Sequence, residues 1–277
     1  MRIGIPEFHE KKDLFNYLKS HKKELIAKKR SMPITADAVS FGFSRVKTTD
    51  TANKSNEAVT EDVDVLRVKV VANTANYLDS HMDVLIPGCW SKTIQERKHL
   101  IPHLHDHVHR LDAKIGEVVD IYASSLSYSE LGIDGSGTTE SLIFVTDVMK
   151  EYNPKVFNQY KAGKVKQHSI GLQYMKIDLA INDEDNEKEM EFWNKYYPQI
   201  INKEMADERG FFWVIQEIKL LENSAVLFGS NEATPTLENN VKNLSNTDNE
   251  PLNSTQNTET EAAKALHENQ VQFYLNT

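Results

Sequence analysis

Residues 164–176 combine the alternation of a β-strand with a serine and a glycine near its middle. In KVKQHSIGLQYMK, Ser169 and Gly171 fall on one side of the predicted strand, whereas His168 and Ile170 fall on the other. A glycine inside a strand often marks a bulge or a place where another group approaches the backbone closely. Ser169 is therefore a candidate nucleophile, although a lone strand serine is more often satisfied by ordinary hydrogen bonds. His168 is poorly placed as its base, so a base must come from elsewhere in the chain.

The composition indicates a soluble, folded chain. Of the 277 residues, 39% are hydrophobic and 26% are charged, and no apolar run approaches the roughly 20 residues of a membrane span. The first residues lack the apolar core of a signal peptide, so we expect no secretory leader. The single cysteine, Cys89, excludes an internal disulfide. A net charge of −9 disfavours nucleic acid as the main partner.

Charge and pattern divide the chain into three parts. Residues 1–60 are predicted to form a basic helical arm and linker, with an amphipathic helix at 13–30. Residues 61–234 carry the strand patterns and are the predicted globular domain. An acidic and then aromatic segment, 183–209, is expected to be a helical insertion that serves as a lid or buttress. Residues 235–277 are acidic and rich in Asn and Thr, which predicts a disordered tail.

Within the domain, strands outnumber helices. Alternation and β-branched residues predict strands at 64–74, 113–122, 140–146, 211–222 and 224–229, in addition to the one that holds Ser169. Helices are expected at 91–97 and 153–162, the second ending at Gly163. This order predicts an α+β fold that is mostly β.

Histidines cluster between residues 98 and 116. Five of the ten lie in KHLIPHLHDHVHRLDAKIG, and the last four alternate: His99, His103, His105, His107 and His109. On a strand these four would share one face, where they could supply a base or bind a metal. HLHDH is one residue short of the HxHxDH signature of metallo-β-lactamases, and only His168 and His267 follow the cluster. Because catalytic zinc usually takes three protein ligands, a zinc hydrolase is the less favoured alternative.

A serine mechanism also needs a group that orients the histidine. The acidic candidates are Asp112, Asp147, Glu217 and Glu222. Glu222 stands out because it lies inside the apolar stretch KLLENSAVLFG, where burying an unpaired acid would be costly. The ordinary alternative is a glutamate at a bend between two strands.

Four segments in one order resemble the prohead proteases of tailed bacteriophages. They are DSHMDVLIPGCWSKTI, HLHDHVHRLDAKIG, KAGKVKQHSIGLQY and LLENSAVLFGSNEATP. The family pattern runs D-x-x-x-D-x-x-x-P-G-x-[FW], a histidine before a hydrophobic-Gly pair, then G-x-x-x-x-x-S-I-G-[FL] and an E-x-S-x-V strand. The resemblance covers about residues 63–235.

The resemblance implies a fold related to the herpesvirus assemblins, a small antiparallel barrel with flanking helices. It implies a serine endopeptidase that needs no metal or other cofactor and processes itself. The major capsid protein and the scaffold protein would be its substrates, inside the immature phage head in the host cytoplasm. Neither nucleic acid nor a membrane is implied as a partner, and association between copies of the chain stays open.

By resemblance, Ser169 matches the nucleophile and Glu222 the orienting acid. Gly171 is expected to lie at the substrate, beside the oxyanion site. The base is His107 if H-L-x-x-H is matched, whereas counting seven residues back from Gly116 gives His109, and His105 shares their predicted face. The rival hypotheses are a zinc-dependent hydrolase that uses the histidines of residues 103–109 and a non-enzymatic capsid assembly or scaffold protein.

Overall fold

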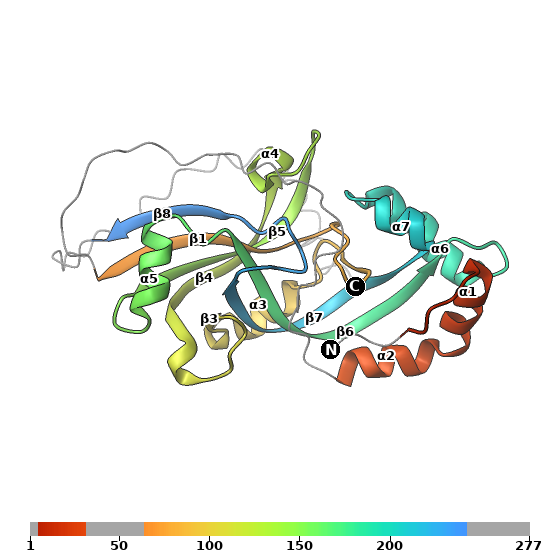
Figure 1. The fold of residues 1–277 in the computed structure, drawn as a ribbon, viewed down its shortest axis with the longest axis horizontal. Coiled ribbons are helices and arrows are strands. Elements are labelled where there is room, and N and C mark those ends of the chain that lie inside the picture. Colours follow the sequence, from red (N-terminus) through yellow and green to blue (C-terminus); the bar gives the residue numbers. More distant parts are fainter. Residues whose placement is uncertain (1–4, 32–63, 243–277) are drawn as a thin grey trace, which may run out of the picture. The chain divides into compact units, whose positions relative to one another are not determined.

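The computed structural model describes residues 5–31 and 64–242, which contain an eight-stranded sheet with helices around it (Figure 1). The strands are β1 (Val65–Thr74), β2 (Asp83–Leu85), β3 (His103–His105), β4 (Lys114–Ser127), β5 (Thr138–Met149), β6 (Gln167–Ile181), β7 (Phe211–Val226) and β8 (Thr236–Lys242). The α-helices are α1 (Lys11–Ser20), α2 (Lys22–Ser31), α3 (Ser91–Arg97), α4 (Tyr128–Leu131), α5 (Pro154–Lys161), α6 (Glu187–Tyr196) and α7 (Glu204–Arg209). Short 3₁₀ turns are η1 (Lys98–Leu100), η2 (Leu111–Ala113) and η3 (Tyr197–Gln199).

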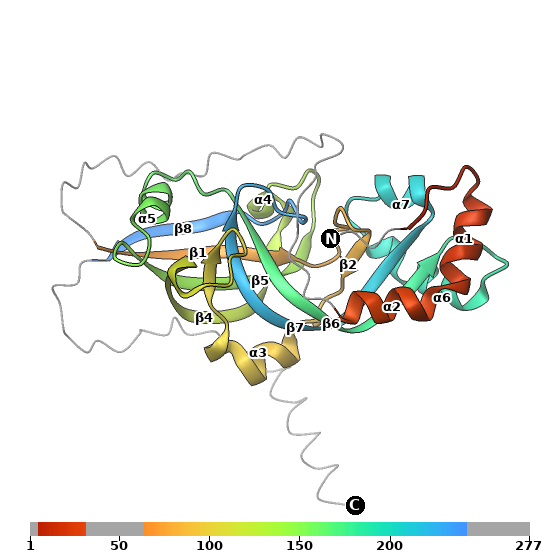
Figure 2. The same cartoon turned by 60° about the horizontal axis from the view of Figure 1, so that its bottom comes forward.

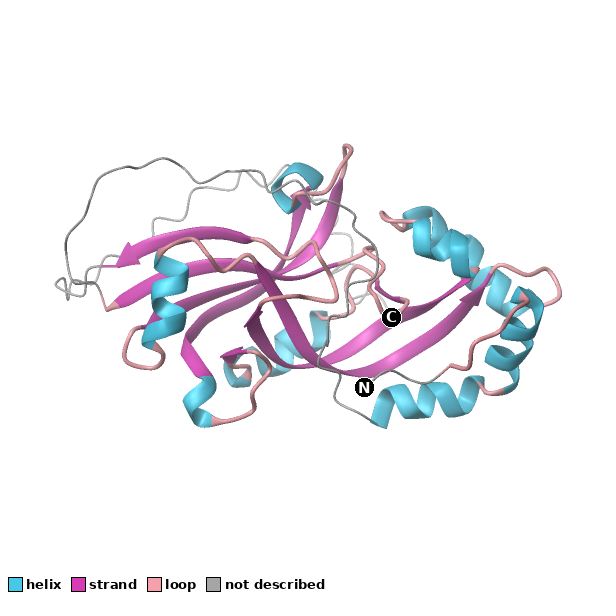
Figure 3. Cartoon of the chain, viewed as in Figure 1, coloured by secondary structure: helices cyan, strands magenta, loops and turns pink. Residues whose placement is uncertain are grey.

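The α+β class with a predominant sheet is confirmed, whereas the strand pairing does not establish the expected small antiparallel barrel. The strand order is β2-β7-β3-β4-β5-β1-β8, with β6 also paired to β7. This ladder is open within the described residues. It is also not wholly antiparallel, because the short strands β2 and β3 run parallel to β7. Figure 3 shows how strongly strands predominate at the centre.

The longest strand, β7, corrects the expectation of two strands separated by a bend. Its sequence FFWVIQEIKLLENSAV is rich in aromatic and β-branched residues, which favour strands. It remains continuous through Glu222 because three partners pair with it along its length: β2, β6 and β3. The acidic residue therefore lies within a buried strand rather than at a strand end.

Helix predictions around the site are confirmed closely. Helix α3 has the predicted bounds. Helix α5 has Pro154 at its first position and is capped by Asn153, whose side chain accepts a hydrogen bond from the Val156 backbone N–H. Gly163 follows α5 with a φ of 64°, which is the left-handed conformation common after a helix end. Helix α5 buries Phe157 and Tyr160 in the core next to the strand that holds Ser169.

The predicted tail begins too early in the chain. Residues 236–242 form β8, which pairs antiparallel with β1 at the edge of the sheet, opposite to β2. Thr236 also donates its hydroxyl to the Val165 carbonyl at 3.0 Å. The ordered domain therefore extends at least to Lys242, and the remainder of the predicted tail lies outside the described residues.

The insertion at 183–209 is helical as predicted, but it is a buttress rather than a lid. Trp193 and Tyr196 of α6 pack with Phe212 and Val214 of β7 in a separate apolar cluster. This cluster lies at the far end of the β6–β7 pair, about 12 residues from Ser169, or roughly 40 Å along an extended strand. Figure 1 shows α6 and α7 at that end, away from β3. The insertion therefore does not cover the serine.

The described part of the basic arm packs against this same end as two helices rather than one (Figure 2). Lys29 of α2 is only 4% exposed, and its Nζ lies 2.5 Å from Oδ1 of Asp83. Tyr174 donates its hydroxyl to the other carboxylate oxygen of Asp83. The Lys29 ammonium also lies over the rings of Tyr174 and Trp213, at 5.4 and 5.5 Å from their centres. Residues 5–31 are thus part of the packed domain.

Candidate active site

The antiparallel register of β6 and β7 places four polar or small residues on one face. Ser169 lies directly opposite Ser224, and Gly171 lies directly opposite Glu222. Directly opposed residues of an antiparallel pair share a face, with Cα atoms about 4.5–5.5 Å apart. The candidate nucleophile and the candidate acid therefore meet on the same surface of the sheet, although they are 53 positions apart in the chain.

Gly171 makes room for the carboxylate. A Cβ atom at this position would overlap Oε1 of Glu222 and would lie 2.9 Å from its Cδ. Any larger residue would therefore push the acid out of its place. This is a different use from the expected one beside the substrate, and it accounts for the glycine without invoking an oxyanion site.

A tight turn after β3 carries the candidate base. Asp106 and His107 both have positive φ, at 50° and 55°, an uncommon conformation for which Asp and His are enriched among non-glycine residues. Backbone bonds fix the turn on both sides, from Asp106 N–H to the Ala225 carbonyl at 3.0 Å and from Val108 N–H to the His105 carbonyl at 3.1 Å. The turn directs His107 onto the face that holds Glu222.

His107 and Glu222 form a close, buried pair. Nδ1 of His107 lies 2.6 Å from Oε1 of Glu222, which is 1% exposed. Because a carboxylate only accepts hydrogen bonds, Nδ1 carries a proton, and in the neutral ring Nε2 keeps its lone pair. Nε2 has no hydrogen-bond partner within the described structure. This tautomer is the one that a general base requires.

Ser169 shares the face of the sheet that holds Glu222. The residue is 5% exposed, and no hydrogen bond to its Oγ is formed within the described residues. The backbone N–H of His107 lies 3.2 Å from Oγ of Ser224, the residue that directly opposes Ser169. Ser169 and His107 are thus linked through Ser224, and a hydrogen bond between a catalytic serine and its base often tightens only when substrate is present.

The alternating histidines do not share one face. The strand ends at His105, and the turn then sends the later residues in new directions. His103 is fully buried, His105 is half-buried with Nδ1 3.7 Å from an Asp106 carboxylate oxygen, and His109 is exposed. In the described part of the chain, no three His, Cys, Asp or Glu side chains are arranged to hold a metal ion. The expected common face was wrong because the alternation continues past the end of the strand.

Two other histidines form a buried polar network behind the site. His103 faces Thr146 Oγ1 through Nδ1 at 2.9 Å and the Asn223 amide through Nε2 at 3.0 Å. His168 contacts the Thr234 carbonyl through Nδ1 at 3.0 Å and the Tyr160 hydroxyl through Nε2 at 2.9 Å. Since an amide nitrogen only donates, Nε2 of His103 accepts and the proton of this ring lies on Nδ1. The Thr234 carbonyl only accepts, so Nδ1 of His168 also carries a proton. His168 is therefore engaged on the side of β6 opposite to Glu222.

Burial lowers the pKa of both network histidines. It takes the pKa of His168 to about 4, and that of His103 well below its ordinary value, with the nearby His168 adding to the effect. A histidine with a lower pKa in the folded state binds protons more readily when unfolded. Its stabilisation is therefore complete above about pH 6.5 and declines as the pH falls toward 4.

We therefore expect acid to destabilise the protein through these histidines. Between pH 7.5 and pH 5.0, His168 alone should reduce the free energy of unfolding by about 2 kcal/mol. Urea unfolding at both pH values measures this loss, and His168→Asn should make it smaller by that amount. His99→Gln, at an exposed position, is the matched control and should leave the pH dependence unchanged. An unaltered pH dependence in His168→Asn would contradict the assignment.

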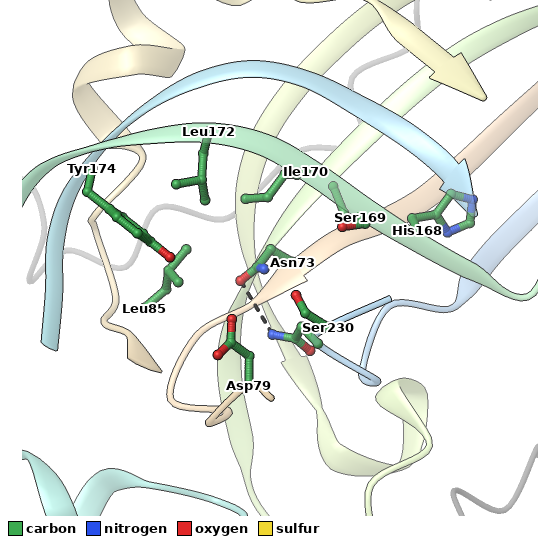
Figure 4. Close-up of a pocket in the computed structure, with 11 residues that line it drawn as sticks. Asn73, Asp79, Leu85, His168, Ser169, Ile170, Leu172, Tyr174 and Ser230 are labelled. Atoms are coloured by element: carbon green, nitrogen blue, oxygen red, sulfur yellow. Dashed lines mark hydrogen bonds between the residues drawn. The ribbon is translucent and has the colours of Figure 1, made fainter. Parts of the chain in front are cut away.

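A small pocket opens beside Ser169 (Figure 4). In the figure, Ile170, Leu172 and Tyr174 of β6 lie along one wall, and Asn73 and Asp79 lie across from them. Ser230 and Asn231 complete the polar side, and the Asn231 amide bonds the Thr74 carbonyl at 2.9 Å. The pocket is narrow, and most of its β6 lining comes from the side of the strand that carries His168 and Ile170.

Two residues near the site were not singled out from the sequence. Ser224 donates to Oε2 of Glu222 at 2.6 Å, and Asn223 holds His103 on the other face. The signal for Ser224 was its two-residue spacing from Glu222, which places both on one side of a strand. The signal was hidden because a bend was expected at Glu222.

Comparisons of the chain with protein-family models, with curated proteins and with solved structures found no match. In the described ranges, no helix combines the length and apolar character needed to cross a membrane.

Proposed function

We propose that the chain is a serine endopeptidase with Ser169 as nucleophile, His107 as general base and Glu222 as orienting acid. The observation that carries the proposal is the buried 2.6 Å contact between His107 Nδ1 and Glu222 Oε1, on the face of the β6–β7 pair that Ser169 shares. A serine, a histidine in this tautomer and a buried carboxylate are the three groups that acyl transfer by serine requires.

In the proposed reaction, Ser169 Oγ attacks the carbonyl carbon of a peptide bond while His107 Nε2 takes its proton. The C–N bond then breaks, and the same proton passes to the departing amine, leaving an acyl ester on Ser169. Water, deprotonated by His107, attacks the ester and releases the acid with Ser169 restored. Glu222 stabilises the imidazolium in both steps.

The motif order favours head proteins as substrates. The segments that resemble prohead proteases include each of the three proposed residues, and the geometry places these residues on one face. We infer that the substrates are the scaffold and capsid proteins of an immature phage head, and the chain itself. An assemblin-like fold is part of this proposal, since the open sheet alone does not establish it.

Incubation of the purified full chain tests the proposal. Intact-mass spectrometry should show the chain shortening with time, and co-expressed capsid and scaffold proteins should be cleaved by the wild type but not by Ser169→Ala. A chelator should leave the rates unchanged. Cleavage that stops with chelator and returns with zinc would instead support the zinc alternative. Cleavage at the wild-type rate in Ser169→Ala would refute the serine mechanism.

A further inference from the structure

We propose that Ser224 is a positioning residue that holds the acid and the base of this site together, an inference that rests on the proposed function. Its hydroxyl makes two contacts with the site. It donates to Oε2 of Glu222 at 2.6 Å, and it accepts from the backbone N–H of His107 at 3.2 Å. One oxygen atom therefore links the carboxylate to the turn that carries the imidazole.

The two oxygens of Glu222 are used separately. Oε1 faces the ring of His107, and Oε2 faces the hydroxyl of Ser224. With one contact at each oxygen, the plane of the carboxylate is fixed against rotation about its last side-chain bond. Gly171 on the opposite strand leaves room for Oε1, since a Cβ at this position would overlap it. Loss of the Ser224 hydroxyl would leave a buried carboxylate oxygen without this donor.

The turn that carries His107 must be stabilised by contacts with residues outside it. Two consecutive non-glycine residues with positive φ, Asp106 and His107, are held in a sparsely populated conformation that persists only when the surroundings determine it. The Ser224 hydroxyl accepts the N–H of His107, the second of these residues. Without it, the turn would keep the contact of Asp106 with Ala225 but lose the one at the base itself.

Ser224 is itself rigidly placed. It is fully buried in β7, where β6 pairs on one side and β3 on the other, opposite Ser169 and Leu104. Its neighbour Asn223 is anchored through the other face of the strand by His103. A hydroxyl on a strand held in this way can set the geometry of a less regular turn. Ser224 acts through Glu222 and His107, and nothing in the proposed reaction requires it to touch the substrate.

Replacement of Ser224 should impair the chemical step more than substrate binding. We expect Ser224→Ala to lower kcat for cleavage about 10- to 100-fold with little change in KM, and to slow labelling of Ser169 by a fluorophosphonate by the same factor. Ser224→Thr, which keeps the hydroxyl, should recover most of the rate. The matched control is Ser141→Ala, a fully buried strand serine on β5 whose side chain has only a 3.4 Å contact with Thr74. It should keep the wild-type rate.

The coupling between substitutions at Ser224 and Glu222 distinguishes a positioning role of Ser224 from a merely structural one. Because Ser224 acts through Glu222, adding Ser224→Ala to Glu222→Gln should lower kcat by less than twofold more. If the two substitutions lowered kcat independently, so that their effects multiplied in the double variant, the proposal would be contradicted. Equal loss of rate in Ser141→Ala and Ser224→Ala would also contradict it, since both remove a buried hydroxyl. Fluorophosphonate attached to Ser224 instead of Ser169 would make Ser224 the nucleophile and end the positioning role.

An NMR measurement tests the inference even if the chain cleaves nothing. The Nδ1 proton of His107, held by the carboxylate, should give a separate downfield resonance in wild type and in Ser141→Ala. We expect this resonance to broaden or vanish in Ser224→Ala and to return in Ser224→Thr. An unchanged resonance in Ser224→Ala would overturn the positioning role. An inactive wild type that shows the resonance would instead refute the proposed function alone.

Discussion

Ser169→Ala and His107→Ala should each reduce cleavage by about 10⁴-fold or more, and the double variant should be little worse than either. The reason is that nucleophile and base act as one unit: a serine without its base is a weak nucleophile, and a base without its serine has no proton to take. Initial rates of self-cleavage and of cleavage of a co-expressed head protein measure the effect. Circular dichroism should show that both variants remain folded.

The neighbouring histidines supply the matched controls. His109 is exposed, and His105 is half-buried and directed to the carboxylate of Asp106. His105→Ala and His109→Ala should therefore retain most of the activity. If His109→Ala were inactive and His107→Ala active, the base would be misassigned, while the serine mechanism would stand. Independent, multiplying losses in the double variant would contradict a shared mechanism.

Gly171→Ala should be nearly as harmful, because its added methyl group would overlap Glu222. The overlap with Oε1 cannot be relieved without moving the carboxylate away from His107. We expect activity to fall about 10³-fold, as for other losses of base orientation, and the free energy of unfolding to fall by about 2–3 kcal/mol. Urea unfolding and cleavage assays measure the two effects separately.

A second substitution distinguishes overlap from a general effect of replacing glycine. Glu222→Ala on the Gly171→Ala background should restore much of the lost stability but none of the activity, since it removes the overlap and the acid together. Gly163→Ala, at a position where no atom lies within 4 Å of the added Cβ, should cost stability through its φ of 64° and leave cleavage unchanged. Full activity in Gly171→Ala would show that Glu222 does not need its present position.

The sequence predicts well what local patterns determine. The bounds of α3, the glycine that follows α5 and the strand around Ser169 all depend on neighbours in the chain, and the structure agrees with each. Features that depend on distant partners were missed. Nothing in the local sequence shows that β7 continues through Glu222, because that continuity comes from pairing with β6 and β3.

The candidate site shows the same division. Ser169 and Glu222 can be selected from residue type and motif order, but their common face follows from the register of two long strands. The assignment of His107 over its neighbours follows from a turn with two positive φ values, which the strict alternation conceals. The roles of Ser224 and Gly171 can be recognised only from the position of the Glu222 carboxylate, which contacts the Ser224 hydroxyl and fills the space left by the missing Cβ of Gly171.

Site-resolved labelling with a fluorophosphonate tests most directly whether Ser169 is activated by His107. The probe should attach to one residue per chain, and peptide mapping by mass spectrometry should locate it at Ser169. Labelling should be unaffected by chelator and should be lost in Ser169→Ala and in His107→Ala. Absence of any label on a folded wild-type chain, or a label at Ser169 that forms equally fast in His107→Ala, would contradict the proposed triad.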